Sequence, residues 1–176
     1  MATTTKAELL ARMKKDGVKF LRLQFTDIMG VNKNIEMPKS EFGKALDGQM
    51  LFDGSSVQGF VRIEESDMLL QPDLDTYTVY PWETPGGTIA RLICDIHHPD
   101  GSPFEGCPRL ALKRMCAKAA DMGYTMHAGP EPEFFLFERG EREEPTVISH
   151  DRGGYFDLTP IDRGEEARRA LCDTLE

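Results

Sequence analysis

The chain has 176 residues, enough for one ordinary domain or for one small domain and part of another. Its residues are 40% hydrophobic and 29% charged, a composition typical of folded proteins and not of disordered ones. Acidic residues outnumber basic ones by 30 to 21, and the resulting net charge of -9 repels phosphate backbones and anionic lipid. We therefore expect no nucleic-acid partner.

The sequence shows no signal for membrane insertion or secretion. Its longest strictly apolar run, residues 134–137, is far shorter than the roughly 20 residues that a membrane span requires. Residues 1–15 are polar and charged, without the apolar segment of a secretory signal. The four cysteines are irregularly spaced and form no C-x-x-C motif, which indicates reduced thiols. We expect a cytoplasmic protein without a membrane segment.

The first 50 residues predict a helix followed by a hairpin. Thr5 and Glu8 have the spacing of a capping box, which predicts a helix over residues 5–16. Apolar and polar residues then alternate over residues 21–26, and a turn leads to a second alternating run at 31–37. Pro38 suits the first position of a short helix that ends at Gly48.

Two more strands are predicted at residues 76–80 and 89–96, on either side of a turn-rich segment at 81–87. Residues 1–97 thus form a small helix-plus-sheet domain. Proline and glycine are frequent at 99–108, where we expect a domain boundary.

The remaining segment predicts a helix over 112–120, a short strand at about 124–128, a buried strand that includes the apolar run at 134–137, and a helix that begins near Asp162. This last helix has no stop signal before the chain ends. We therefore expect the 176 residues to be less than the whole functional unit.

Glu131 and Glu133 are the first candidate chemical pair. In a strand both side chains would point to one face, and two such carboxylates at the mouth of an apolar strand call for neutralising cations. Magnesium or manganese ions are the natural partners of oxygen ligands. The alternative is that Pro130 and Pro132 hold a solvated loop in which the two glutamates have no role.

Asp53 is the second candidate, because it precedes Gly54 and the hydroxyls of Ser55 and Ser56 in a set that can accept and relay protons. The alternative is an ordinary Asp-Gly turn. Asp67 has the same ambiguity, and Arg62 could serve regulation or merely pair with neighbouring acids.

A zinc module built from Cys94, His97, His98 and Cys107 is disfavoured, because the spacing matches no standard finger. Walker and dinucleotide glycine motifs are also absent from the sequence. A bound nucleotide would therefore be held through metal and not by a P-loop.

Six strings, read together, resemble glutamine synthetase of the bacterial and archaeal type I class over the whole chain. They follow one another in the order of that family. The strings are LFDGSS at 51–56, GFVRIEESDM at 59–68, PDLDT at 72–76, CDI at 94–96 with PDG at 99–101, GPEPEFF at 129–135, and GGYFD at 153–157.

The resemblance implies an α+β fold, with a β-grasp domain over residues 1–105 and the beginning of a catalytic α/β domain over 106–176. It implies ATP-dependent synthesis of glutamine from glutamate and ammonium through a γ-glutamyl phosphate. Glu131 and Glu133 would bind Mg2+ or Mn2+ beside ATP. Asp53 would help to deprotonate ammonium in the site of the adjacent subunit of a dodecamer, with Ser56 and Tyr155 lining that pocket and Asp67 near the same interface.

Chains of this family are more than twice as long, and the resemblance implies that further metal and nucleotide ligands lie beyond Glu176. We therefore expect a truncated chain that is inactive alone. The alternative is a non-catalytic interaction module that assembles with full-length subunits.

Overall fold

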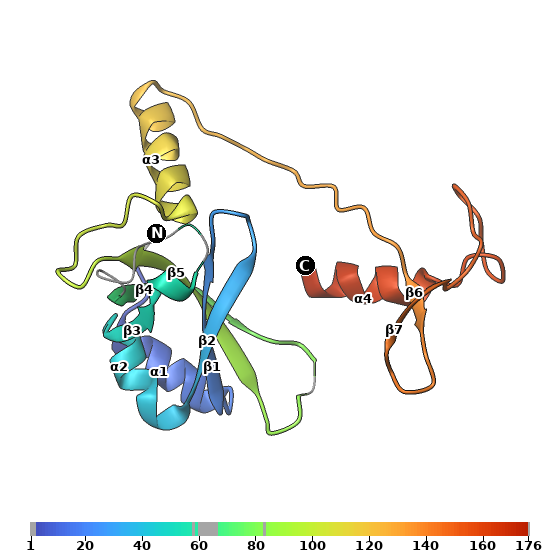
Figure 1. Ribbon diagram of the computed structural model, residues 1–176, viewed down its shortest axis with the longest axis horizontal. Coiled ribbons are helices and arrows are strands. Elements are labelled where there is room, and N and C mark those ends of the chain that lie inside the picture. The colour runs from blue at the N-terminus through green and yellow to red at the C-terminus, as the bar shows by residue number, and fades with distance from the viewer. Residues whose placement is uncertain (1–2, 58, 60–66, 83, 176) are drawn as a thin grey trace. The chain divides into compact units, whose positions relative to one another are not determined.

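The computed structural model describes residues 3–57, 59, 67–82 and 84–175. The chain forms two compact units, Met1–Met126 and His127–Glu176 (Figure 1). Arg62 and most of the string at 59–68 lie outside the described residues.

The first unit is built on a five-stranded mixed sheet with the strand order β2-β1-β5-β4-β3. The central strand β5 pairs with β1 in parallel and with β4 in antiparallel orientation, and the two outer pairs, β1 with β2 and β3 with β4, are antiparallel. The strands are β1 (Phe20–Thr26), β2 (Asn32–Pro38), β3 (Met50–Asp53), β4 (Asp67–Val79) and β5 (Ile89–His97).

The described part of this unit has three α-helices: α1 (Lys6–Lys15), α2 (Phe42–Leu46) and α3 (Pro108–Asp121). Short 3-10 helices η1 (Lys39–Glu41) and η2 (Gly54–Ser56) join the strands. Every second residue of β1 is buried, so Leu21, Leu23 and Phe25 enter one core with Leu9 and Met13 of α1. Burial of this apolar surface is the main force that holds α1 on the sheet.

Several predictions for this unit are confirmed. The capping box of Thr5 and Glu8 is formed, and α1 lies within the predicted range. The hairpin is confirmed by the antiparallel register that places Leu23 opposite Ile35. The strand predicted at 76–80 was too short, since β4 begins at Asp67, and the four-residue β3 was not predicted. Sheet and helices together confirm the α+β class.

The second unit contains a hairpin of β6 (Phe137–Arg139) and β7 (Pro145–Ser149), followed by α4 (Glu165–Leu175). The last helix begins three residues later than predicted. Asp162 makes a side-chain hydrogen bond to the N–H of Gly164, and the carbonyl of Gly164 accepts the first helical bond from Arg168. Asp162 therefore shapes the turn before the helix and is not part of it.

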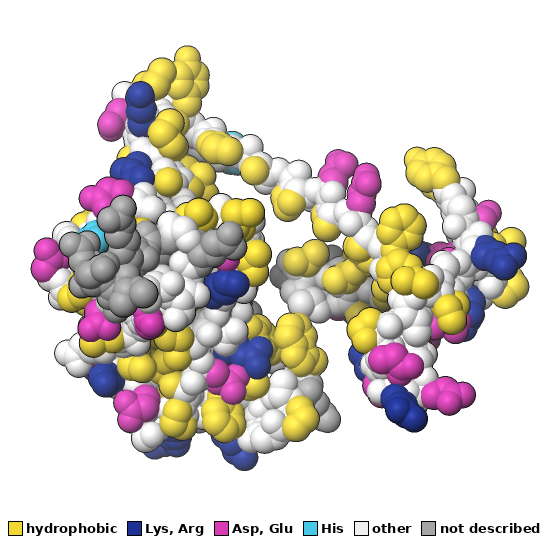
Figure 2. Space-filling view, viewed as in Figure 1, with side chains coloured by type: hydrophobic (Ala, Val, Ile, Leu, Met, Phe, Trp, Pro, Cys, Tyr) yellow, Lys and Arg dark blue, Asp and Glu magenta, His cyan; other side chains and the backbone are white. Residues whose placement is uncertain are grey.

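Two strand predictions were wrong. Residues 124–128 and 131–136 have no regular secondary structure, and Phe135 is 83% exposed instead of buried. A strand needs a neighbour for its backbone hydrogen bonds, and none of the described strands pairs with these residues. Hydrophobic side chains consequently lie open on the surface of this unit (Figure 2).

Among the described residues, no helix combines the length and the apolar character needed to cross a membrane.

Candidate functional site

Asp53 ends β3 and caps η2, and its carboxylate is held by the two serines that follow. Oδ1 accepts hydrogen bonds from the Ser55 backbone N–H at 2.9 Å and from the Ser55 hydroxyl at 2.6 Å. Oδ2 accepts a bond from the Ser56 hydroxyl at 3.1 Å. These bonds, led by the Ser55 hydroxyl, lower the pKa of Asp53, so the side chain is an anion at neutral pH. Asp53 and Ser56 are both exposed to solvent.

Asp67 lies directly opposite Asp53 in the antiparallel β3–β4 register. The sequence alone gave no register for this pair. Side chains of directly paired residues project on the same face with Cβ atoms roughly 5 Å apart. Beneath this end of the sheet, the ring of Phe52 packs against Phe25 with centroids 4.9 Å apart, which fixes β3 against the core. Two exposed acids therefore mark one end of a well-anchored strand pair.

Glu131 and Glu133 lie in the irregular segment before β6, and both are exposed. Their predicted placement in a strand is therefore wrong, although one residue still separates the two carboxylates. In the parts of the chain that the structure describes, no group of three or more His, Cys, Asp or Glu side chains is arranged to hold a metal ion. This applies both to the glutamate pair and to the zinc module considered from the sequence. Glu131 and Glu133 offer at most a partial ligand set.

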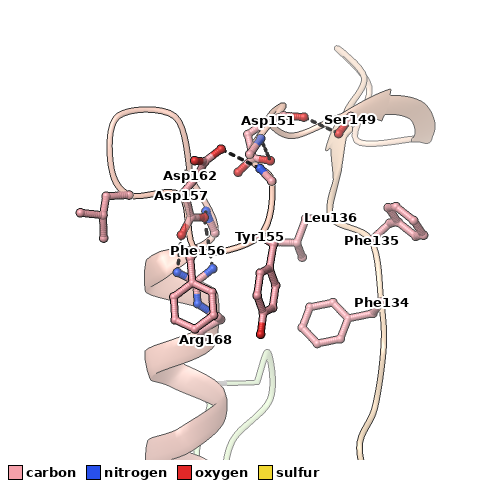
Figure 3. Close-up of a pocket in the computed structure, with 14 residues that line it drawn as sticks. Phe134, Phe135, Leu136, Ser149, Asp151, Tyr155, Phe156, Asp157, Asp162 and Arg168 are labelled. Atoms are coloured by element: carbon pink, nitrogen blue, oxygen red, sulfur yellow. Dashed lines mark hydrogen bonds and ion pairs between the residues drawn. The ribbon is translucent and has the colours of Figure 1, made fainter.

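Tyr155 is one of the residues that line a hollow of about 810 Å³ in the second unit (Figure 3). The apolar wall of the hollow comes from Phe134, Phe135, Leu136 and Phe156, and the Tyr155 and Phe156 rings meet edge to face at 4.5 Å. Tyr155 is 93% exposed, so its hydroxyl is available to a ligand.

Three aspartates, Asp151, Asp157 and Asp162, form an acidic frame that holds the loop that carries Tyr155 (Figure 3). Asp151 accepts the N–H groups of Gly153 at 3.2 Å and Arg163 at 2.7 Å, and Asp157 accepts the N–H of Gly154 at 2.9 Å. Asp151 thereby ties the start of the loop to the residues that lead into α4. The N–H of Arg163 is the main reason that the pKa of Asp151 is lowered.

Asp162 completes this frame through a two-point ion pair with Arg168 of α4, one contact of which measures 3.1 Å. The Arg168 guanidinium lowers the pKa of Asp162. Sequence reasoning missed Asp151, Asp162 and Arg168. The only local signal is their position on either side of the GGYFD string.

Two family models together match most of the chain. A family model described as glutamine synthetase, β-grasp domain, matches residues 17–99, and one described as glutamine synthetase, catalytic domain, matches residues 105–176. The chain thus combines a β-grasp domain with part of a catalytic domain. It belongs to the glutamine synthetase family.

Two curated relatives illustrate the similarity. Glutamine synthetase of Thermus thermophilus is 58% identical over 97% of this chain and 39% of its own length. Glutamine synthetase of Clostridium saccharobutylicum is 54% identical over 100% of this chain and 40% of its own length. The chain therefore spans about two fifths of the length of these relatives.

Two solved structures share the fold. A cryo-electron microscopy structure of Plasmodium falciparum glutamine synthetase has a TM-score of 0.72 at 19% identity and covers 99% of this chain and 40% of its own. This likeness shows the fold alone. A complex of GmaS with ADP has a TM-score of 0.59 at 28% identity and covers 65% of this chain and 26% of its own.

Proposed function

We propose that the protein containing this chain synthesises glutamine from glutamate, ammonium and ATP. The observation that carries the proposal is the match of two glutamine synthetase family models, in order, to residues 17–99 and 105–176. In this reaction the glutamate side-chain carboxylate attacks the terminal phosphate of ATP, which yields γ-glutamyl phosphate and ADP. Ammonia then displaces phosphate and forms the amide. The β-grasp and catalytic domains would meet between residues 105 and 106.

Glu131 and Glu133 are proposed ligands of two divalent cations, Mg2+ or Mn2+, beside ATP. The donor set supports this role, since Mg2+ is commonly held by one or two carboxylates together with water and substrate phosphates. A partial, exposed pair of carboxylates suits that kind of site. When bound, the cations would offset charge on the transferring phosphoryl group. The GmaS complex with ADP supports a nucleotide site in a related fold.

Asp53 is the proposed acceptor of the ammonium proton. Ammonium has no lone pair and becomes a nucleophile only after it loses a proton, so an anion that both attracts and deprotonates it serves the second step. Ser55 and Ser56 orient the carboxylate, which remains open to solvent. Ser56 and Tyr155 would line the ammonium pocket, and Asp67 would lie near the same interface.

The proposed site is shared between subunits of a homo-oligomer, a dodecamer in the family that the sequence resembles. Exposure of Asp53 at the end of β3 supports its use by a neighbouring subunit. Residues 1–176 alone would lack glutamine synthetase activity, since they span about two fifths of the relatives' length. The cytoplasm is the proposed location, and four free cysteines support a reducing compartment.

The test is glutamine formation by a chain extended past Glu176, with ATP, magnesium and ammonium varied in turn. Asp53→Ala should lower kcat/KM for ammonium by roughly a hundredfold or more, because a proton acceptor is lost. Glu131→Gln should raise the magnesium concentration that gives half-maximal activity by roughly tenfold or more. Asp121→Ala and Glu141→Gln, at exposed acids, are the matched controls.

A folded extended chain that forms no glutamine under any of these conditions would refute the proposal. Residues 1–176 that co-purify with full-length subunits, without restoring activity to subunits that carry Asp53→Ala, would instead support the interaction module.

A further inference from the structure

Four charged side chains join α3 to the sheet of the first unit. Arg109, in the first turn of α3, donates to Asp95 Oδ1 of β5 at 2.8 Å and to Asp73 Oδ2 of β4 at 2.6 Å. Lys113, one turn later, donates to Asp95 Oδ2 at 2.5 Å and lies 3.8 Å from Asp73. We call Asp73, Asp95, Arg109 and Lys113 the ion-pair cluster.

Arg109 and Lys113 have different roles in the cluster. Arg109 spans two carboxylates on neighbouring strands because its planar guanidinium presents several N–H groups in a fork. Lys113 neutralises the second oxygen of Asp95, which is only 8% exposed and would be costly to bury without a partner. Although burial opposes the charged form, the bonds to Asp73 and Asp95 raise the pKa of Arg109. Two positive and two negative charges thus balance across three elements.

Among the residues that the structure describes, other attachments of α3 to the sheet are few. None of its residues is buried, and Leu112, Met115 and Met122 at its C-cap are more than half exposed. The chain just before the helix is anchored by buried Cys107 and Phe104, and Leu110 packs against the core at its edge. These apolar contacts fix where α3 starts. Side chains at two successive turns, from Arg109 and Lys113, are needed to fix its direction.

The ion-pair cluster joins segments that match two different family models. Asp73 and Asp95 belong to the segment that matches the β-grasp model, whereas Arg109 and Lys113 belong to the segment that matches the catalytic model. The cluster therefore crosses the junction between the two family domains. The compact units of the structure nevertheless divide after Met126, with α3 on the N-terminal side.

We propose that the ion-pair cluster is an interdomain lock that makes α3, the first helix of the catalytic segment, part of the rigid N-terminal unit. The connection around residues 99–105, which the cluster spans, is then held in place, and the first unit ends after α3. This inference concerns the chain itself and does not depend on the proposed reaction.

Hydrogen exchange of residues 1–176, followed by mass spectrometry, tests the lock. Arg109→Met keeps a good helix former in place and removes both bridges. Exchange over 108–121 should accelerate roughly tenfold, as expected for loss of a partly buried ion pair, while β4 and β5 keep their protection. Lys118→Met removes an exposed cation from the same helix and should leave exchange over α3 unchanged.

A second variant covers the case in which Arg109→Met also weakens the sheet, because it leaves Asp73 poorly compensated. Arg109→Met combined with Asp73→Asn restores the balance between Asp95 and Lys113 but still lacks the bridge. The lock predicts a protected sheet and a fast-exchanging α3 in this double variant. Protection of α3 equal to that of the unmodified chain, or equal acceleration in α3, β4 and β5, would overturn it.

Discussion

Leu92 should be among the costliest positions to truncate in the sheet. It lies on β5, which is paired on both edges, and in parallel register with Leu23 of β1. Both side chains are 0% exposed. Leu→Ala in a core costs about 2–5 kcal/mol, from lost transfer free energy and from the cavity that remains. Because strands on both sides hinder collapse around Leu92, we expect about 4 kcal/mol, the upper part of that range.

The assay is urea unfolding followed by far-UV circular dichroism, with Leu51→Ala as the matched control. Leu51 is in β3 of the same sheet but is 53% exposed, so its truncation should cost less than about 1 kcal/mol. The Leu92→Ala midpoint should fall while the denaturant slope stays constant. Equal losses for the two variants would refute the placement of β5 at the centre of the core.

Two further predictions concern local hydrogen bonds. Thr5→Ala removes the α1 capping box and should cost about 1 kcal/mol in the same urea assay, whereas Thr3→Ala should cost nothing measurable. The N–H groups of Val31 and Met29 lower the pKa of Asp27 from 3.8, so the unfolded chain binds this proton more readily than the folded one. The resulting stability is present above pH 3.8 and is lost as the pH falls through the folded pKa. Asp27→Asn should therefore lower the free energy of unfolding near pH 7 and flatten its fall below pH 3.8. If the free energy of unfolding of Asp27→Asn fell below pH 3.8 as steeply as that of the unmodified chain, this prediction would be contradicted.

Local features could be predicted because their physical cause lies within a few residues. The capping box needs only the spacing of Thr5 and Glu8, and the β1–β2 hairpin follows from alternation on both sides of a short turn. The strings around Asp53 and Glu131 likewise led to the glutamine synthetase family, which the family models then showed.

The same local reasoning failed where a partner decides the outcome. The apolar run at 134–137 predicted a buried strand, yet of these residues only Phe137 lies in a described strand, where it pairs with Ser149. The run stays exposed because no described segment covers it. β3 was missed because four residues are too few to show a period. The roles of Asp151 and Asp162 depend on hydrogen bonds across a loop, so they could not be predicted from the local sequence either.

By itself, the sequence determined the α+β class, the ends of α1, the hairpin and the family. The tertiary structure decided that β1 lies beside β5, that Asp53 faces Asp67, and that Arg109 bridges two strands. Each of these depends on residues from 14 to 69 positions apart, whose pairing is selected by the burial of a common core and not by the propensity of either segment.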